Sequence, residues 1–198
     1  PFYTVALELP GLTVSGERMA DKAAAEQLKE ACQGAAATIK KVECKEKSEK
    51  PPALYDLTTL QRDANRLLGF TAQQTLDYLQ SLYEKKLCTY PRTDSRYLTG
   101  DMADSLPVLV NLVANAMPFR KGIAITCDPH VVINDKKVTD HHAVIPTRNL
   151  KDADLSALPA GEKAVLELVA LRLLCAVAQP HIYSETVVIA ACAGGEFT

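Results

Sequence analysis

The chain has 198 residues, of which 47% are hydrophobic and 23% are charged, so it can bury a core and is not a disordered chain. Its 22 basic and 24 acidic residues give a formal net charge of −2, which excludes a polycation that coats nucleic acid through bulk charge. Any contact with nucleic acid must therefore come from a local patch. The most apolar run, residues 164–178, is interrupted by Glu167 and Arg172 and is too short to span a membrane.

The N-terminus has no features of a targeting segment, because the chain opens at Pro1 with a strand-like run rather than a basic stretch and an apolar core. It also starts without Met, so we expect a piece excised from a longer protein. The six cysteines form no CxxC pair and lie mostly in apolar runs. This pattern favours reduced core thiols over a zinc knuckle or disulfides, and a cytoplasmic location is the corresponding expectation.

The first 50 residues have mainly strand character. Residues 3–9 alternate loosely, and residues 37–44 form a second strand-like run. Between the two runs, Asp21 is placed to cap a helix that continues to Cys32, with Gly34 just after its end. The charged stretch KEKSEKPP (45–52) then ends in two prolines and is the predicted domain boundary.

The residues after this boundary have helical character. Asp56 begins and Gly69 ends a predicted helix with one apolar face. The next helix begins with the capping-box spacing of Thr71 and Gln74 and has a leucine stripe. Two helices joined by a glycine-containing turn are the pattern of a helix-turn-helix DNA reader, and equally of any two packed helices.

The remaining segments complete an α+β prediction. We expect a helix over 102–117 that stops at Pro118, short strands over 123–127 and 130–133, a helix over 161–178 and a strand over 185–193. The prediction is a mostly helical, helix-turn-helix-like central domain (51–182) inserted in a small β-rich domain made of residues 1–50 and 183–198. Because both ends are β-rich, we expect them to share one sheet domain.

The segment KKLCTYPRTDSRYL (85–98) carries the most chemistry. A tyrosine hydroxyl is a poor nucleophile, with a pKa of about 10, but Arg92 beside Tyr90 can bind two phosphate oxygens and stabilise the charge that develops during attack. Thr93 and Ser95 offer hydroxyls to neighbouring phosphates. The alternative is an ordinary surface turn in which Tyr90 packs and Arg92 pairs with Asp94.

A second cluster is TDHHAVIPT (139–147). Adjacent histidines on an extended segment point in opposite directions, so His141 and His142 cannot both face one site. One of them can donate to a phosphate or move a proton, and the other packs elsewhere. A metal site with Asp140 and a purely structural histidine pair are the alternatives. The DAD spacing at 152–154 lies in a polar loop and is interpreted as solvated.

Residues 54–98, LYDLTTLQRDANRLLGFTAQQTLDYLQSLYEKKLCTYPRTDSRYL, resemble the active-site region of type IA DNA topoisomerases. Residues 139–147 resemble the second signature of that family, in the order and at a separation compatible with it. The HHA form is closer to topoisomerase III than to topoisomerase I, which more often has Glu in the second position. The resemblance is clear over 51–182 and softer over 1–50 and 183–198, which look like the β-rich hinge domain of the family.

This resemblance implies an ATP-independent isomerase that cleaves and rejoins one DNA strand through a 5′-phosphotyrosine. Tyr90 matches the nucleophile, Arg92 the arginine beside the scissile phosphate, and His141 the active-site histidine. The implied partner is single-stranded DNA, and the implied DNA-binding residues are Thr89, Thr93, Asp94, Ser95, Arg96 and His142.

One departure from the family is large. The catalytic Mg²⁺ of these enzymes is held by an acidic Toprim domain, and neither that domain nor the one that clamps single-stranded DNA is matched here. We therefore expect no metal-binding residue in this chain, no full activity from it alone, and the remaining domains of the same polypeptide as partners. The alternative is a non-catalytic helix-turn-helix module over 57–86, which the absence of Lys and Arg from 71–80 disfavours.

Overall fold

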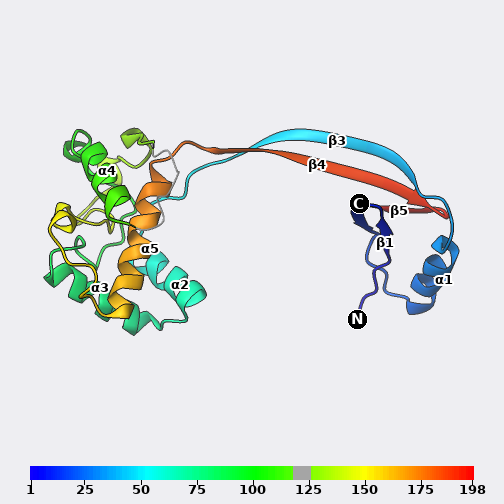
Figure 1. The fold of residues 1–198 in the computed structure, drawn as a ribbon, viewed down its shortest axis with the longest axis horizontal. Helices are drawn as coiled ribbons and strands as arrows, with labels where there is room; N and C mark the ends of the chain where they lie inside the picture. Colours follow the sequence, from blue (N-terminus) through cyan, green and yellow to red (C-terminus); the bar gives the residue numbers. More distant parts are fainter. Residues whose placement is uncertain (118–125) are drawn as a thin grey trace. The chain divides into compact units, whose positions relative to one another are not determined.

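The computed structural model describes residues 1–117 and 126–198. The chain divides into two compact units, one made of Pro1–Glu49 with Ile182–Thr198 and the other of Lys50–His181 (Figure 1). Part of the strand expected over 123–127 lies outside the described residues. In the described part of the chain, no helix is long and apolar enough to cross a membrane.

The first unit contains a hairpin, a helix and a three-stranded sheet. Strands β1 (Ala6–Leu9) and β2 (Leu12–Ser15) pair antiparallel around Gly11, whose φ of 76° suits the turn. Helix α1 (Lys22–Cys32) begins as predicted, with the Asp21 side chain accepting a hydrogen bond from the amide of Ala23 at 2.9 Å. The second sheet has the order β3 (Thr38–Glu49), β4 (His181–Cys192), β5 (Gly195–Phe197).

Strands from the two ends of the chain meet in the three-stranded sheet, where β3 pairs with β4. β1 belongs to the two-stranded sheet and β4 to the three-stranded one. The two sheets are linked by a bridge between Gly16, just after β2, and Phe197 of β5, and by a common apolar core that includes Val5, Val14, Ala190 and Phe197. A two-residue turn pairs β1 with β2, and closing so short a loop costs little entropy.

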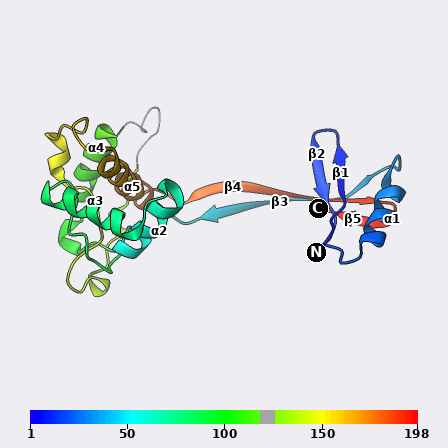
Figure 2. The same cartoon turned by 90° about the horizontal axis from the view of Figure 1, so that it is seen from below.

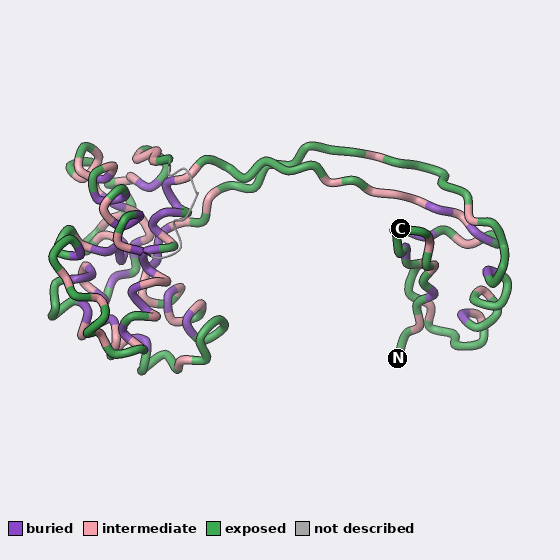
Figure 3. Tube along the Cα trace, in the orientation of Figure 1, coloured by how far each residue is buried: buried purple, intermediate pink, exposed green. Residues whose placement is uncertain are grey.

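Strand β3 continues through the charged stretch after Cys44 as far as Glu49. Its side chains are almost all exposed, as Figure 3 shows along the length of β3. Lys47 forms an ion pair with Glu185 of the adjacent strand β4, at 2.6 Å. Pairing with a distant strand therefore overrides a composition that is typical of a loop.

The second unit is built on four α-helices within its described residues: α2 (Leu57–Leu68), α3 (Ala72–Glu84), α4 (Leu106–Ala116) and α5 (Ala160–Ala176). The predicted caps are confirmed. Asp56 caps α2, Gly69 ends it in a left-handed conformation, and Thr71 and Gln74 form the capping box of α3. α5 lies beside α2 and α3 in both Figure 1 and Figure 2.

The connections between these helices contain short 3-10 turns: η1 (Gly100–Met102), η3 (Pro129–Val131), η4 (Asp135–Lys137) and η5 (Arg148–Lys151).

Two predictions for this unit are corrected by the structure. The helix expected from residue 102 begins at Leu106, and residues 130–133 do not form the expected strand. Pro129 and the Asp128 side chain, which accepts from the His130 amide at 3.0 Å, favour a turn there.

The interior of this unit is one large apolar core. It contains leucines and valines from all four helices together with the extended segments on either side of them. Its fully buried large side chains include Leu54, Leu60, Leu79, Leu82, Leu98, Leu106, Ile145, Leu166 and Leu173. Ile145 places the second signature segment in this core, which fixes it against the segment that carries Tyr90.

Candidate active site

The chain leaves α3 through a turn that is held from outside the helix. Lys86 has a φ of 60°, unusual for a residue other than glycine. Its carbonyl accepts hydrogen bonds from the Thr147 hydroxyl and, at 3.0 Å, from the Asn149 side chain. The amide of Thr147 also donates to the carbonyl of Leu87 at 2.9 Å. The end of the second signature segment thus sets the direction in which the chain approaches Tyr90.

Thr89 directly joins the two signature segments, residues 85–98 and 139–147. Its amide donates to the carbonyl of Ile145 at 3.0 Å. Its hydroxyl donates to the carbonyl of Ala143 at 3.1 Å and accepts from the amide of Ile145 at 3.0 Å. Thr89 was predicted to bind DNA, but in the structure its polar groups are used to hold the backbone beside Tyr90.

Tyr90 is half-buried and contacts two other rings. The centroids of the Tyr90 and His141 rings are 4.2 Å apart, with their planes inclined at 40°. The centroids of Tyr90 and Tyr83 are 5.5 Å apart, with the planes nearly perpendicular at 83°. The structure therefore brings together the predicted nucleophile and the predicted histidine, which are far apart in the sequence.

Arg92 and Asp94 are both exposed. Within the described residues, neither side chain forms an ion pair or a hydrogen bond. The alternative in which Arg92 pairs with Asp94 in an ordinary turn is therefore not what the structure shows. An exposed guanidinium with no carboxylate partner is available to bind an anion.

Thr93 and Ser95 are buried, and Arg96 is partly buried. Thr93 is 7% exposed and its hydroxyl donates to the carbonyl of His141 at 2.8 Å, while Ser95 is 4% exposed and donates to the carbonyl of Lys137 at 2.8 Å. The Arg96 side chain donates through Nε to the carbonyl of Leu54 at 3.2 Å. The Thr93 and Ser95 hydroxyls and the Arg96 Nε are thus engaged with backbone carbonyls.

The two histidines have different surroundings, as the alternation argument requires. His141 is exposed beside Tyr90, whereas His142 is partly buried with its Nδ1 2.8 Å from the carbonyl of Ala143. Among residues 1–117 and 126–198, no three histidine, cysteine or acidic side chains are grouped to hold a metal ion. The described residues therefore do not fit a magnesium site, and the metal alternative at Asp140 has no support.

Sequence reasoning missed the residues that fix the end of α3. Glu162 of α5 is buried and accepts from the Ser81 hydroxyl at 2.9 Å, and it forms an ion pair with Lys85 at 2.5 Å. Tyr83 lies between these two residues in the sequence. A glutamate in the first turn of a helix is an ordinary feature, so no sequence signal distinguished Glu162. The seven-residue spacing of Tyr83 and Tyr90 was equally uninformative.

A second polar network is formed by Tyr55, Asp63 and Arg172. The Arg172 guanidinium stacks 4.1 Å from the centroid of the Tyr55 ring and forms an ion pair with Asp63. The Tyr55 hydroxyl donates to Asp63 at 2.8 Å. Burial, and then the hydrogen bond to Asp63, raise the pKa of Tyr55 to about 12. This network joins α2 to α5 and stabilises the frame around the signature segments.

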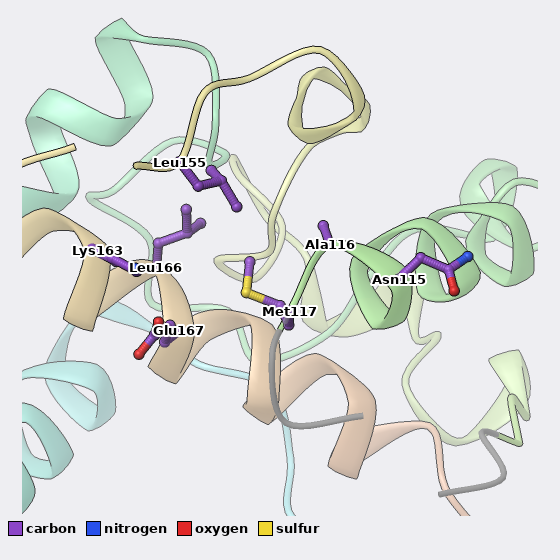
Figure 4. A pocket seen from close by; sticks show the side chains of 7 residues that line it. All are labelled: Asn115, Ala116, Met117, Leu155, Lys163, Leu166 and Glu167. Carbon is purple, nitrogen blue, oxygen red and sulfur yellow. The ribbon is translucent and has the colours of Figure 1, made fainter. Parts of the chain in front are cut away.

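A cavity of about 300 Å³ lies between the end of α4 and the first turns of α5 (Figure 4). It is lined by Asn115, Ala116, Met117, Leu155, Lys163, Leu166 and Glu167. None of the residues predicted to act on DNA lines it. The candidate site is therefore the exposed surface around Tyr90 and not this apolar cavity.

Comparison with known proteins defines the class to which this fold and site belong. A family model described as DNA topoisomerase matches residues 1–198, so the chain belongs to the DNA topoisomerase family. Among its relatives, the DNA topoisomerase 3 of Shouchella clausii is 39% identical and that of Bacillus subtilis 35% identical, each over 211 residues. The resemblance to type IA enzymes of the topoisomerase III kind is confirmed.

The chain spans less than a third of these relatives. The alignments cover 99% and 100% of this chain but 28% and 29% of the two relatives. A solved structure, that of full-length topoisomerase I from Thermotoga maritima, has a TM-score of 0.73 over 98% of this chain and 32% of that one, at 23% identity. That likeness shows a shared fold and confirms the α+β prediction.

Proposed function

We propose that this chain is the tyrosine-bearing part of a type IA DNA topoisomerase, which cleaves and rejoins one DNA strand through a 5′-phosphotyrosine. The observation that carries the proposal is the contact between the Tyr90 and His141 rings, at 4.2 Å. It joins the two segments that resemble the signatures of the family. In this proposal, residues 51–182 form the catalytic-tyrosine domain, and residues 1–50 with 183–198 belong to the hinge.

In the cleavage step, the Tyr90 hydroxyl oxygen attacks the phosphorus of a phosphodiester. The new bond joins that oxygen to phosphorus, and the bond from phosphorus to the 3′ oxygen breaks. The phenolic proton is lost and the 3′ oxygen gains a proton, so the step is balanced. Because the tyrosine–phosphate bond retains the energy of the phosphodiester, the 3′ hydroxyl can reverse the reaction without ATP.

Arg92 and His141 have separate roles in this step. The exposed Arg92 guanidinium binds two oxygens of the scissile phosphate and stabilises the charge that builds up on them. His141 contacts Tyr90 through its ring, which leaves its nitrogens able to donate to a phosphate oxygen. Asp94 and His142 complete the proposed DNA-binding surface, and Thr89, Thr93, Ser95 and Arg96 hold it in place.

In this proposal, the rest of the complete polypeptide supplies the metal site and the domain that clamps single-stranded DNA. Mg²⁺ is the cofactor that the resemblance implies, and we assign its ligands to the Toprim domain outside this chain. The domain that clamps single-stranded DNA is the other partner. The isolated 198 residues should then bind single-stranded DNA weakly and in a salt-sensitive way, because few cations surround Tyr90. We place the protein in the cytoplasm, in keeping with six free thiols.

The test is denaturing electrophoresis of a labelled single-stranded oligonucleotide mixed with protein and Mg²⁺. The complete polypeptide should give a protease-sensitive covalent band that Tyr90→Phe abolishes, since this change deletes the nucleophile but keeps the ring. The isolated chain should give no band. A band from the isolated chain would contradict its dependence on other domains, and preferential binding of duplex DNA without any band would favour the helix-turn-helix alternative.

Arg92→Ala gives a graded test of the same site. We expect cleavage to fall by about 10²–10³-fold, as for the loss of other donors that stabilise a developing oxyanion. Arg62→Ala is the matched control, because Arg62 is an exposed arginine on α2 with no ion pair in the described part of the chain. Equal losses from the two changes would show that Arg92 acts only through general charge.

A further inference from the structure

Tyr83, on α3 just before residues 85–98, contacts the proposed nucleophile. It is the last but one residue of α3 and is 39% exposed. Its ring is nearly perpendicular to the ring of Tyr90, at 83°, with the centroids 5.5 Å apart. This is the edge-to-face arrangement that aromatic pairs prefer, because the positive edge of one ring meets the negative face of the other.

The contacts that orient the Tyr90 side chain are made by its ring and not by its hydroxyl group. Within the described residues, no hydrogen bond is made by the Tyr90 hydroxyl. The contacts that fix its ring are those with His141 and Tyr83. Such an arrangement selects one orientation of the ring while leaving the hydroxyl free to attack.

The end of α3 that carries Tyr83 is itself held firmly. Ser81 and Lys85, on either side of Tyr83 in the sequence, both bind the buried carboxylate of Glu162 on α5. The Thr147 and Asn149 side chains then bind the carbonyl of Lys86, in the turn after the helix. These contacts fix the Tyr83 backbone relative to the segment that leads to Tyr90, and so limit where the Tyr83 ring can lie.

We propose that Tyr83 is a positioning residue that holds the Tyr90 ring in the orientation required for attack on phosphorus. This inference rests on the proposed function of Tyr90. Reaction rates are sensitive to small displacements of a nucleophile, because only conformers close to the attack geometry react. Loss of the Tyr83 ring therefore lowers the fraction of protein in the reactive conformation and leaves the DNA-binding surface intact.

The experiment compares Tyr83→Leu and Tyr83→Phe in the complete polypeptide. Single-turnover cleavage at saturating oligonucleotide gives the rate of the chemical step, and oligonucleotide titration gives the dissociation constant. Leucine fills much of the space but has no aromatic edge, so the rate should fall by about 3- to 10-fold, in line with the usual strength of such pairs. The dissociation constant should not change. Phenylalanine keeps the ring and should restore the rate.

Tyr78→Leu is the matched control. Tyr78 lies on the same helix and forms an edge-to-face pair with Phe70, at 5.3 Å and 61°, but contacts neither Tyr90 nor His141. This change should lower thermal stability without lowering the cleavage rate of the folded protein. If Tyr78→Leu slows cleavage as much as Tyr83→Leu does, the effect is general destabilisation and the proposal is wrong.

The outcomes separate this inference from the proposed function. If the unchanged protein forms no covalent adduct, or if Tyr90→Phe still forms one, the proposed function fails. If the adduct forms normally and Tyr83→Leu cleaves at the unchanged rate, only the role of Tyr83 fails. A raised dissociation constant with an unchanged rate at saturation would likewise overturn positioning, because Tyr83 would then act by stacking on a DNA base.

Discussion

The Thr93 hydroxyl donates a hydrogen bond to the carbonyl of His141, with 2.8 Å between the two oxygens. The same hydroxyl accepts from the amide of Ser95 at 3.1 Å. A buried side chain in the loop after Tyr90 thus holds the backbone of the proposed active-site histidine. The two signature segments are therefore one structural unit, although they are far apart in the sequence.

Thr93→Val tests this link. Valine has a similar shape but no hydroxyl, so it leaves the His141 carbonyl and the Ser95 amide without their partner. We expect the free energy of unfolding of the isolated chain to fall by about 1–3 kcal/mol, measured by urea titration followed by circular dichroism. Thr93→Ser keeps the hydroxyl, so its free energy of unfolding should fall much less. Equal losses from the two variants would mean that packing of the methyl group matters and the hydrogen bond does not.

Lys86→Gly should stabilise the chain. Lys86 has a φ of 60°, and this left-handed conformation costs a residue with a side chain roughly 1–2 kcal/mol. Glycine adopts it freely but loses more entropy on folding, so we expect a net gain of about 0.5–1 kcal/mol. Gln80→Gly, inside α3, should instead cost about 1 kcal/mol. The free energy of unfolding of both variants is obtained from urea titration. A loss of stability in Lys86→Gly would contradict this account of the turn.

Asp63 should make the helical unit sensitive to acid. Burial of this carboxyl raises its pKa, but the hydrogen bonds from Tyr55 and Arg66 and the charge of Arg172 outweigh that effect and leave the pKa below its ordinary value. A depressed pKa in the folded state contributes stability above the unfolded pKa of about 3.9, and this stability is lost as the pH falls through the folded pKa.

Asp63→Asn is therefore expected to be less stable than the unchanged chain at pH 7, with the difference shrinking as the pH is lowered below about 4. Thermal unfolding followed at 222 nm measures it, since that signal comes from the helices. Asp101→Asn, which changes an exposed carboxyl outside this network, should show no such trend. A stability difference that stays constant from pH 7 to pH 3 would show that the Asp63 charge is not the cause.

Local signals in the sequence were sufficient to predict where helices α2 and α3 begin and where α2 ends. Asp56, Gly69, Thr71 and Gln74 act within one helical turn of their own position, so their roles can be predicted without knowing what packs nearby. The second half of β3, after Cys44, was not predicted, for the opposite reason. Its charged residues resemble a loop, and only pairing with β4, from the other end of the chain, makes them a strand.

In the site too, the features that depend on distant contacts could not be predicted from local sequence. Nothing local in the sequence placed the Tyr90 and His141 rings together, and only the resemblance to a family joined their two segments. Tyr83 and Glu162 escaped prediction because their contacts depend on how α3 meets α5. Thr93 and Ser95 were assigned to DNA because their hydroxyls lie close to Tyr90 in sequence. The structure turns both side chains inward to backbone carbonyls.

The most direct test of the account is to find the residue that becomes joined to DNA. The complete polypeptide is allowed to cleave a single-stranded oligonucleotide, trapped by denaturation, and digested with protease and nuclease. Mass spectrometry of the peptides should then show a nucleotide 5′-phosphate on the Tyr90 hydroxyl and on no other residue. A nucleotide attached to another residue, or through a 3′-phosphate, would contradict the assignment of Tyr90 as the nucleophile of a type IA reaction.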